Sequence, residues 1–214
     1  MLKFLASVVV SVVLSVSSVL ALIHGVGPVK NDNATLRQAT WLVKGEFSTC
    51  SGVLIAPKRL LTAAHCEQPV MTVGGEEARV LARNAAVDLL LLEVNVRGVY
   101  IPVYLANLPE DVAVKVVGFP LNRGVQYLTE GVTQGDVPGY EFYTAISAPV
   151  IFGNSGGPVF AKVNGKWMVV GIVSAVASGA IGGMFPFVVP HMGLMVNGQA
   201  IKQFLKDVDV AVGR

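Results

Sequence analysis

The sequence has little charge and no concentration of basic residues. Charged side chains make up 14% of its 214 residues, the formal net charge is +2, and lysine and arginine nowhere form a run. A nucleic-acid partner would require a clustered basic patch, so we expect no nucleic-acid binding. Cysteine is scarce too, with two residues, and beyond the N-terminus the chain has no internal repeat or low-complexity segment.

Apolar residues, glycine and proline are plentiful by contrast. Hydrophobic residues make up 53% of the chain, which also holds 23 glycines and 11 prolines. Short apolar runs alternate with turn residues, a pattern typical of many short strands in a sandwich or barrel. The length suits one compact unit, or two small ones that share an interface. We therefore expect an all-β fold.

The N-terminal segment, residues 1–25, differs from the rest. Lys3 precedes an apolar stretch, residues 4–23, that carries serines but no charge. A basic start, an apolar stretch and the small-residue site Val19-Leu20-Ala21 are typical of a secretory signal peptide. About 20 apolar residues also suffice to span a bilayer, so a retained membrane anchor is the alternative. Either way we expect export, giving a secreted or periplasmic protein that residues 4–23 could hold at a membrane.

Cys50 and Cys66 are the two cysteines. An exported chain reaches a non-reducing compartment, in which they would be able to pair. In the chain-entropy model, closing that loop would stabilise the fold by about 3 kcal/mol. The alternative is two buried free thiols, and we favour the disulfide because it would lie beside His65.

The apolar runs form two sets of strands, followed by a helix. Asn107-Leu108-Pro109-Glu110-Asp111 is the clearest internal break, and Asn164-Gly165 predicts a type I′ hairpin turn. Apolar residues recur at helical spacing from Ile201 to Val208, after Asn197 as a suitable N-cap. The expected strands are 39–44, 52–55, 59–62, 70–73, 79–83 and 88–94, then 112–119, 125–129, 142–146, 158–163, 166–174 and 184–189. The expected divisions are a linker at 26–38, an N-terminal barrel at 39–110, a C-terminal barrel at 111–196, and a helix and tail at 197–214.

Ser155 is the candidate nucleophile. It lies in Gly153-Asn154-Ser155-Gly156-Gly157-Pro158, where glycines permit a sharp turn and the close approach of a substrate carbonyl. A serine hydroxyl needs a base to take its proton. Such a turn can also point the N–H groups of Gly153 and Ser155 at one spot, an oxyanion hole for an acyl-transfer intermediate. The alternative is a structural Gly/Ser turn.

The same residues fit Gly-x-Ser-x-Gly, the nucleophile elbow of α/β-hydrolases, but the chain order does not. That class needs an acid and then a histidine after the serine. His191 follows Ser155, yet no Asp or Glu lies between them. Pro158 would also break the helix into which an elbow leads. We therefore exclude an esterase or lipase of that fold.

His65 is the candidate general base. It lies in Leu61-Thr62-Ala63-Ala64-His65-Cys66, at the end of an apolar strand. A lone histidine usually has no chemical role. Here the small flanking residues, the adjacent cysteine and the downstream serine motif favour one. We expect His24 to be inert and His191, in a turn after Pro190, to be structural.

Asp88 is the candidate for the acid that acts together with Ser155 and His65. This acid must hold the imidazole in one tautomer and stabilise its cation. It opens a strongly apolar strand, and a carboxylate there needs a partner because burying it unpaired is costly. Glu93 is the main alternative, but it lies within the expected strand rather than at its start. The other acidic residues considered occupy turn-like, solvated contexts; they are Glu76, Glu77, Glu110, Asp111 and Asp136.

Three motifs together resemble the trypsin-like, chymotrypsin-fold serine proteases in order and spacing. They are Thr62-Ala63-Ala64-His65-Cys66, Asp88-Leu89-Leu90-Leu91-Leu92 and residues 153–159. The resemblance covers roughly residues 39–208, and implies two six-stranded antiparallel β-barrels with the active site between them and a short C-terminal α-helix. It implies a serine endopeptidase that cuts polypeptides through Ser155, His65 and Asp88, with no cofactor and no metal ion. Family members usually pair the cysteine beside the catalytic histidine with one like Cys50.

Asn154 departs from the secreted animal members of that family. Those carry an aspartate before the nucleophile, which binds a newly cut N-terminus on activation. An asparagine cannot form that ion pair, so we expect no activation by that route. The motif style resembles instead bacterial HtrA/DegP-type or compact viral proteases, and we expect no PDZ domain.

Residues 171–176 resemble the family's substrate-pairing strand, so Ser174, Ala175 and Val176 are expected to bind substrate. Val176 replaces a glycine that many members have and would narrow the pocket, and Ala148–Val150 at its expected base includes no acid. We therefore expect a small or medium apolar residue at P1, immediately before the cleaved bond. A function of another class is a non-catalytic binding module on the same fold, tethered at a membrane. The sequence leaves the oligomeric state open.

Overall fold

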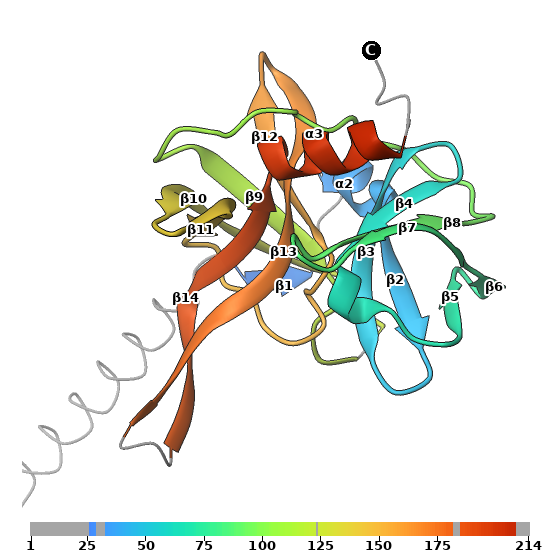
Figure 1. The fold of residues 1–214 in the computed structure, drawn as a ribbon, viewed down its shortest axis with the longest axis horizontal. Helices are drawn as coiled ribbons and strands as arrows, with labels where there is room; N and C mark the ends of the chain where they lie inside the picture. Colours follow the sequence, from blue (N-terminus) through green and yellow to red (C-terminus); the bar gives the residue numbers. More distant parts are fainter. Residues whose placement is uncertain (1–25, 29–32, 123, 182–184, 209–214) are drawn as a thin grey trace, which may run out of the picture.

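The computed structural model describes residues 26–28, 33–122, 124–181 and 185–208 (Figure 1). The expected signal or anchor segment, residues 1–25, lies outside them. Within the described ranges, no helix is both long enough and apolar enough to cross a membrane.

The first sheet has the strand order β6-β5-β2-β3-β4-β8-β7, and all its pairings are antiparallel. Its strands are β2 (Thr40–Gly45), β3 (Thr49–Ala56), β4 (Arg59–Thr62), β5 (Met71–Val73), β6 (Glu76–Glu77), β7 (Arg79–Asn84) and β8 (Leu89–Glu93). No strand pairing closes this sheet within the described part of the chain, so it is a half-barrel of seven strands rather than a closed barrel of six.

Strand β8 of the first sheet contains four consecutive leucines because both of its faces are buried. Successive side chains of a strand point to opposite faces. Leu89 and Leu91 pack in one hydrophobic cluster, whereas Leu90 and Leu92 pack in another. All four are at most 1% exposed. A strand with both faces buried needs an unbroken apolar run, and the run ends where Glu93 reaches solvent.

The second sheet closes into a six-stranded barrel through the pairing of β9 with β10, with β1 added outside β10. Its strands are β1 (Val26–Pro28), β9 (Ala113–Gly118), β10 (Tyr127–Val137), β11 (Tyr140–Ile146), β12 (Pro158–Val163), β13 (Lys166–Ile181) and β14 (Phe185–Asn197). Asn164 and Gly165 both have positive φ between β12 and β13, as the predicted hairpin turn requires.

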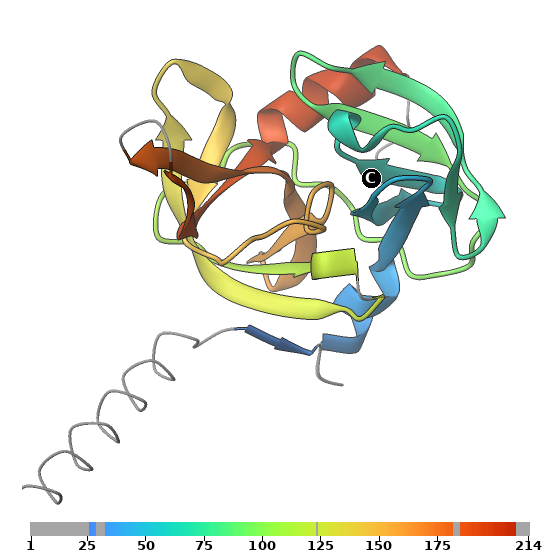
Figure 2. The same cartoon turned by 90° about the horizontal axis from the view of Figure 1, so that it is seen from below.

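The helices are short. In the described part of the chain they are α2 (Ala34–Ala39), η2 (Ala64–Cys66), η3 (Pro120–Asn122) and α3 (Gly198–Asp207). The side chain of Asn197 accepts a hydrogen bond from the Ala200 amide at 3.0 Å, so this residue caps α3 as expected. Ile201, Phe204 and Leu205 of α3 join a core cluster that draws residues from both sheets. Figure 2 shows the sheets as two neighbouring lobes, with α3 along one side of them.

Within the range 26–38 that was predicted to be a linker, residues 26–28 form β1 and residues 34–38 belong to α2, so these parts are elements of the fold and not a linker. β1 pairs with β10, and Leu36 of α2 is fully buried in the shared core. Thr40 donates a hydrogen bond to the Leu36 carbonyl at 2.8 Å, which ties α2 to the start of β2. The polar sequence concealed these elements because a short edge strand and a single buried leucine leave little hydrophobic pattern.

Candidate active site

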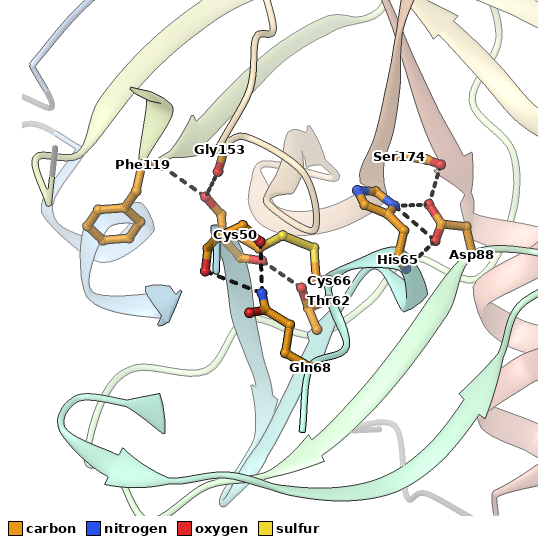
Figure 3. The surroundings of a disulfide bond; sticks show 11 residues. Cys50, Thr62, His65, Cys66, Gln68, Asp88, Phe119, Gly153 and Ser174 are labelled. Carbon is orange, nitrogen blue, oxygen red and sulfur yellow. Dashed lines mark hydrogen bonds and ion pairs between the residues drawn. A yellow bond between two sulfur atoms is a disulfide. The ribbon is translucent and has the colours of Figure 1, made fainter. Parts of the chain in front are cut away.

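His65 lies in η2, directly after β4. Thr62, at the end of β4, is fully buried and donates a hydrogen bond to the Ser51 carbonyl at 2.7 Å, which holds this corner to β3. Cys66 is joined to Cys50 in a disulfide, with Sγ atoms 2.02 Å apart. The His65 side chain remains 46% exposed, and its ring lies between the disulfide and Asp88 (Figure 3).

Asp88 contacts two groups of His65, its backbone amide and its ring. The backbone N–H of His65 donates to Oδ1 of Asp88 at 2.9 Å, and Nδ1 of the ring lies 2.9 Å from Oδ2. Asp88 has a φ of +57°, a left-handed conformation that aspartate tolerates better than most residues. The structure therefore places the Asp88 carboxylate against both the ring and the backbone amide of His65. When Nδ1 donates its proton to the carboxylate, Nε2 is left as the basic nitrogen.

Ser174 of β13 completes the surroundings of Asp88. Its hydroxyl donates to Oδ2 of Asp88 at 2.5 Å. Sequence reasoning named Ser174 only as a substrate-binding residue and missed this contact. No local signal indicates it, because the two residues are 86 positions apart: Asp88 directly precedes β8 of the first sheet, and Ser174 lies in β13 of the second.

The charge states of the pair follow from these contacts. The hydrogen bond to Asp88 raises the pKa of His65 above its usual 6.5, and it outweighs burial, which acts in the opposite direction. Burial pushes the pKa of Asp88 upward, but the hydrogen bonds from His65 and Ser174 outweigh it and hold that pKa below 3.8. At neutral pH Asp88 is therefore an anion that stabilises a cationic imidazole.

Ser155 lies in a tight loop whose backbone is hydrogen-bonded to both sheets. The Ser155 carbonyl accepts from the Ser51 amide at 2.8 Å, and the Gly156 amide donates to Val173 at 2.7 Å. Gly156 has a φ of +75°, and a Cβ there would lie 2.0 Å from Oγ1 of Thr62. Only glycine fits this position, so the loop that carries Ser155 packs directly on the strand that leads to His65.

Ser51 is a further functional residue that the sequence did not reveal. Its fully buried hydroxyl donates to the Gly153 carbonyl at 2.7 Å and accepts from the Phe119 amide at 2.9 Å. One side chain of β3 thus fixes two loops of the other sheet. Ser51 and Gly153 are 102 positions apart, and a serine inside a strand matches no motif.

Three groups around Ser155 make no hydrogen bond within the described part of the chain. They are the Ser155 hydroxyl and the amides of Gly153 and Ser155. The hydroxyl is thus not bonded to His65 in this structure. An oxyanion hole is formed by amides that have no acceptor within the protein, and these two have none in the described residues.

The region expected to receive the substrate side chain is apolar. Ala148 and Val150 are buried in the core of the closed barrel, and Val176 packs against that cluster while remaining partly exposed. Ala175 beside it is exposed. Val176 pairs in register with Gly193, whose missing side chain leaves room for Val150.

The alternative acid and the other histidines lie elsewhere. Glu93, at the far end of β8, is held by Arg79 at 2.7 Å and by Arg59 at 3.4 Å. The hydrogen bond from Arg79 is the main cause that lowers the pKa of Glu93. Nδ1 of His191 lies 3.3 Å from the Ser147 carbonyl, and His24 lies outside the described residues.

The sequence matches a protein-family model, and the fold matches solved structures. The family model described as a trypsin-like peptidase domain matches residues 50–172. No curated protein matches the chain. A mutant of Rv3671c from M. tuberculosis H37Rv in its inactive form shares 20% identity with a TM-score of 0.65, over 86% of this chain and 95% of that one.

Two further solved structures have the same TM-score of 0.65 at 18% identity. The serine endoprotease from Yersinia pestis matches over 85% of this chain and 67% of its own. The HtrA-type protease AlgW, solved with a tripeptide, matches over 83% of this chain and 62% of its own. At these identities the likeness shows the fold.

Proposed function

The chain belongs to the trypsin-like peptidase family and is a serine endopeptidase, and from that premise we propose that Ser155, His65 and Asp88 are its catalytic residues. The observation that carries this assignment is the double contact of Asp88 with the ring and the amide of His65. Of the acids weighed from the sequence, Asp88 alone has that contact, and Glu93 is engaged by two arginines instead.

The chemistry follows from these positions. Nε2 of His65 takes the proton of Ser155 as its oxygen attacks the peptide carbonyl, and Asp88 stabilises the imidazolium that forms. The amides of Gly153 and Ser155 donate to the oxyanion of the tetrahedral intermediate. His65 then gives its proton to the leaving amine. A water molecule attacks the acyl-enzyme in the same way, with His65 again as base.

A fluorophosphonate probe tests this assignment, because it labels only an activated serine. We expect wild-type protein to be labelled, Ser155→Ala to be unlabelled, and the matched variant Ser48→Ala to be labelled at the wild-type rate. Labelling of Ser155→Ala, or no labelling of folded wild type, contradicts the assignment.

We further propose a small or medium apolar P1 residue, bound between the Ala148–Val150 segment and Val176. Ser174, Ala175 and Val176 would pair with the substrate backbone beside this pocket. With no acidic group in the segment, a P1 lysine would be desolvated without a partner. Peptides that differ only at P1 should be cut at least about tenfold faster with Ala or Val than with Lys. Val176→Gly should shift this preference towards larger residues; faster cleavage after Lys contradicts the proposal.

We also propose that the chain is exported by residues 1–25 and functions in an oxidising compartment with Cys50 and Cys66 paired. The pairing of Cys50 with Cys66 in the structure and the apolar N-terminal sequence support this proposal. Mass spectrometry of the mature protein tests it, since a chain that begins after Ala21 indicates signal removal and an intact N-terminus indicates an anchor. A cytosolic protein with two free thiols contradicts it.

A further inference from the structure

Cys50, Cys66 and His65 bring three potential metal ligands together. The two sulfur atoms and one ring nitrogen of His65 all lie within 4.8 Å of one another. In the oxidised protein the sulfurs are bonded to each other and bind no metal. Figure 3 shows the disulfide on one side of the His65 ring and Asp88 on the other. Breaking the sulfur–sulfur bond would therefore create two thiols beside an imidazole.

Thiolates and imidazole are the ligands that Zn²⁺ prefers. Two thiolates at about 2.3 Å from a tetrahedral ion lie about 3.8 Å apart, a separation that rotation of the two side chains can reach once the bond is broken. Nδ1 of His65 is already held by Asp88, which leaves Nε2 for the ion. A ligating histidine whose other nitrogen donates to a carboxylate is the usual arrangement around zinc in proteins.

The frame around these ligands does not depend on the disulfide. The His65 amide is held by Asp88 at 2.9 Å, the Cys66 amide donates to Ala63 at 3.2 Å, and Thr62 is bonded to Ser51. β3, which contains Cys50, pairs with β4, which precedes Cys66 in the chain. The two cysteines are buried, but His65 is 46% exposed and opens a path for an ion and for a water as fourth ligand.

We propose that reduction of the Cys50–Cys66 disulfide creates an inhibitory Zn²⁺ site in the active site, formed by Cys50, Cys66 and His65. A thiol or phosphine reductant supplies two electrons, and two protons from solvent complete the two thiols. Binding of Zn²⁺ releases both protons, so the bound ligands are two thiolates and a neutral imidazole. Oxidation of the pair to the disulfide removes two ligands and releases the ion.

The consequence for activity rests on the proposed function of His65. An ion on Nε2 occupies the nitrogen that must accept the Ser155 proton. The reduced, zinc-bound chain is therefore inactive, and pairing of the cysteines activates it. Asn154 cannot form an ion pair with a newly cut N-terminus. Formation of the disulfide, an oxidation, would therefore activate the protein in place of proteolytic cleavage.

Metal stoichiometry tests the site independently of catalysis. The full-length chain is reduced with tris(carboxyethyl)phosphine, exposed to Zn²⁺, passed through gel filtration and analysed for bound zinc. We expect one zinc ion per chain for the reduced protein and none for the oxidised one. Co²⁺ in place of Zn²⁺ should give a thiolate charge-transfer absorption in the reduced protein only. Without metal the reduced protein should retain hydrolysis, which Zn²⁺ abolishes and a chelator restores.

Matched variants separate this site from incidental binding. His65→Ala should weaken zinc binding at least about tenfold, Cys50→Ala with Cys66→Ala should abolish it, and His191→Ala should leave it unchanged. Equal zinc binding by oxidised and reduced protein overturns the proposal, as does loss of near-ultraviolet circular dichroism on reduction. Fluorophosphonate labelling of the oxidised protein tests the proposed function separately, so failure of one proposal is distinguishable from failure of the other.

Discussion

At the scale of single residues, Asp88 is the position with the most demanding surroundings. It combines a left-handed backbone with hydrogen bonds to its carboxylate from three groups, the ring and the amide of His65 and the hydroxyl of Ser174. The sequence predicted an acid here because an unpaired carboxylate beside a buried strand is costly. It could not predict the Ser174 hydroxyl, because folding alone brings β13 to this carboxylate.

Replacing Asp88 with asparagine should lower kcat by about 10⁴-fold while the protein stays folded. Asparagine has nearly the same shape and tolerates positive φ, but its amide cannot stabilise a cationic imidazole. Steady-state kinetics and thermal unfolding together measure this. Glu93→Gln is the control, with kcat unchanged; a wild-type kcat for Asp88→Asn would exclude the residue from the mechanism.

The pH dependence of hydrolysis should report the raised pKa of His65. The base acts only when neutral, so kcat/KM should fall as the pH decreases through that pKa, which lies above 6.5 because of the hydrogen bond to Asp88. Ser174→Ala removes one of the bonds that hold the pKa of Asp88 down and should leave the direction of this limb unchanged. An acid limb with its midpoint below 6.5, or full activity at about pH 4, contradicts the assignment of His65.

At the scale of elements, most strands could be predicted from the sequence, but two very short strands could not. Each expected strand has a counterpart, because turn residues and apolar runs mark strands locally. β6 and β1 were missed because each spans too few residues to show alternation. The Ser155 loop was recognised by its glycines, yet which glycine is indispensable emerges only from the packing of Gly156 against Thr62 and Ser51.

Gly156→Ala should abolish hydrolysis and destabilise the protein. Its Cβ would lie 2.0 Å from Oγ1 of Thr62 and 2.4 Å from the Ser51 carbonyl, so the loop must move. Gly165→Ala is the matched control, with a φ of +76° but nothing within 4 Å of its Cβ. It should cost about 1–2 kcal/mol for the left-handed conformation and leave kcat intact. Equal effects of the two variants on activity would show that crowding at Gly156 does not matter.

At the scale of the whole molecule, the first sheet supplies His65 and Asp88, and the second supplies the Ser155 loop. Ser51 joins them, and replacing it with alanine leaves the Phe119 amide without a partner. We expect Ser51→Ala to lower the free energy of unfolding by about 1–3 kcal/mol and also to lower kcat, because Gly153 loses its support. Ser147→Ala, which removes a hydrogen bond within the second sheet alone, should affect stability only. Denaturant unfolding and kinetics distinguish the two; unchanged kcat for Ser51→Ala would assign Ser51 to stability alone.

The core cluster shared by both sheets has a consequence for a chain cut between Glu110 and Asp111. Each fragment alone would expose the apolar side chains that the other covers, and neither would carry a complete set of reacting groups. Mixed together, the fragments should recover hydrolysis by a second-order process whose rate follows the product of their concentrations. The rate of hydrolysis would then measure the association of the two fragments.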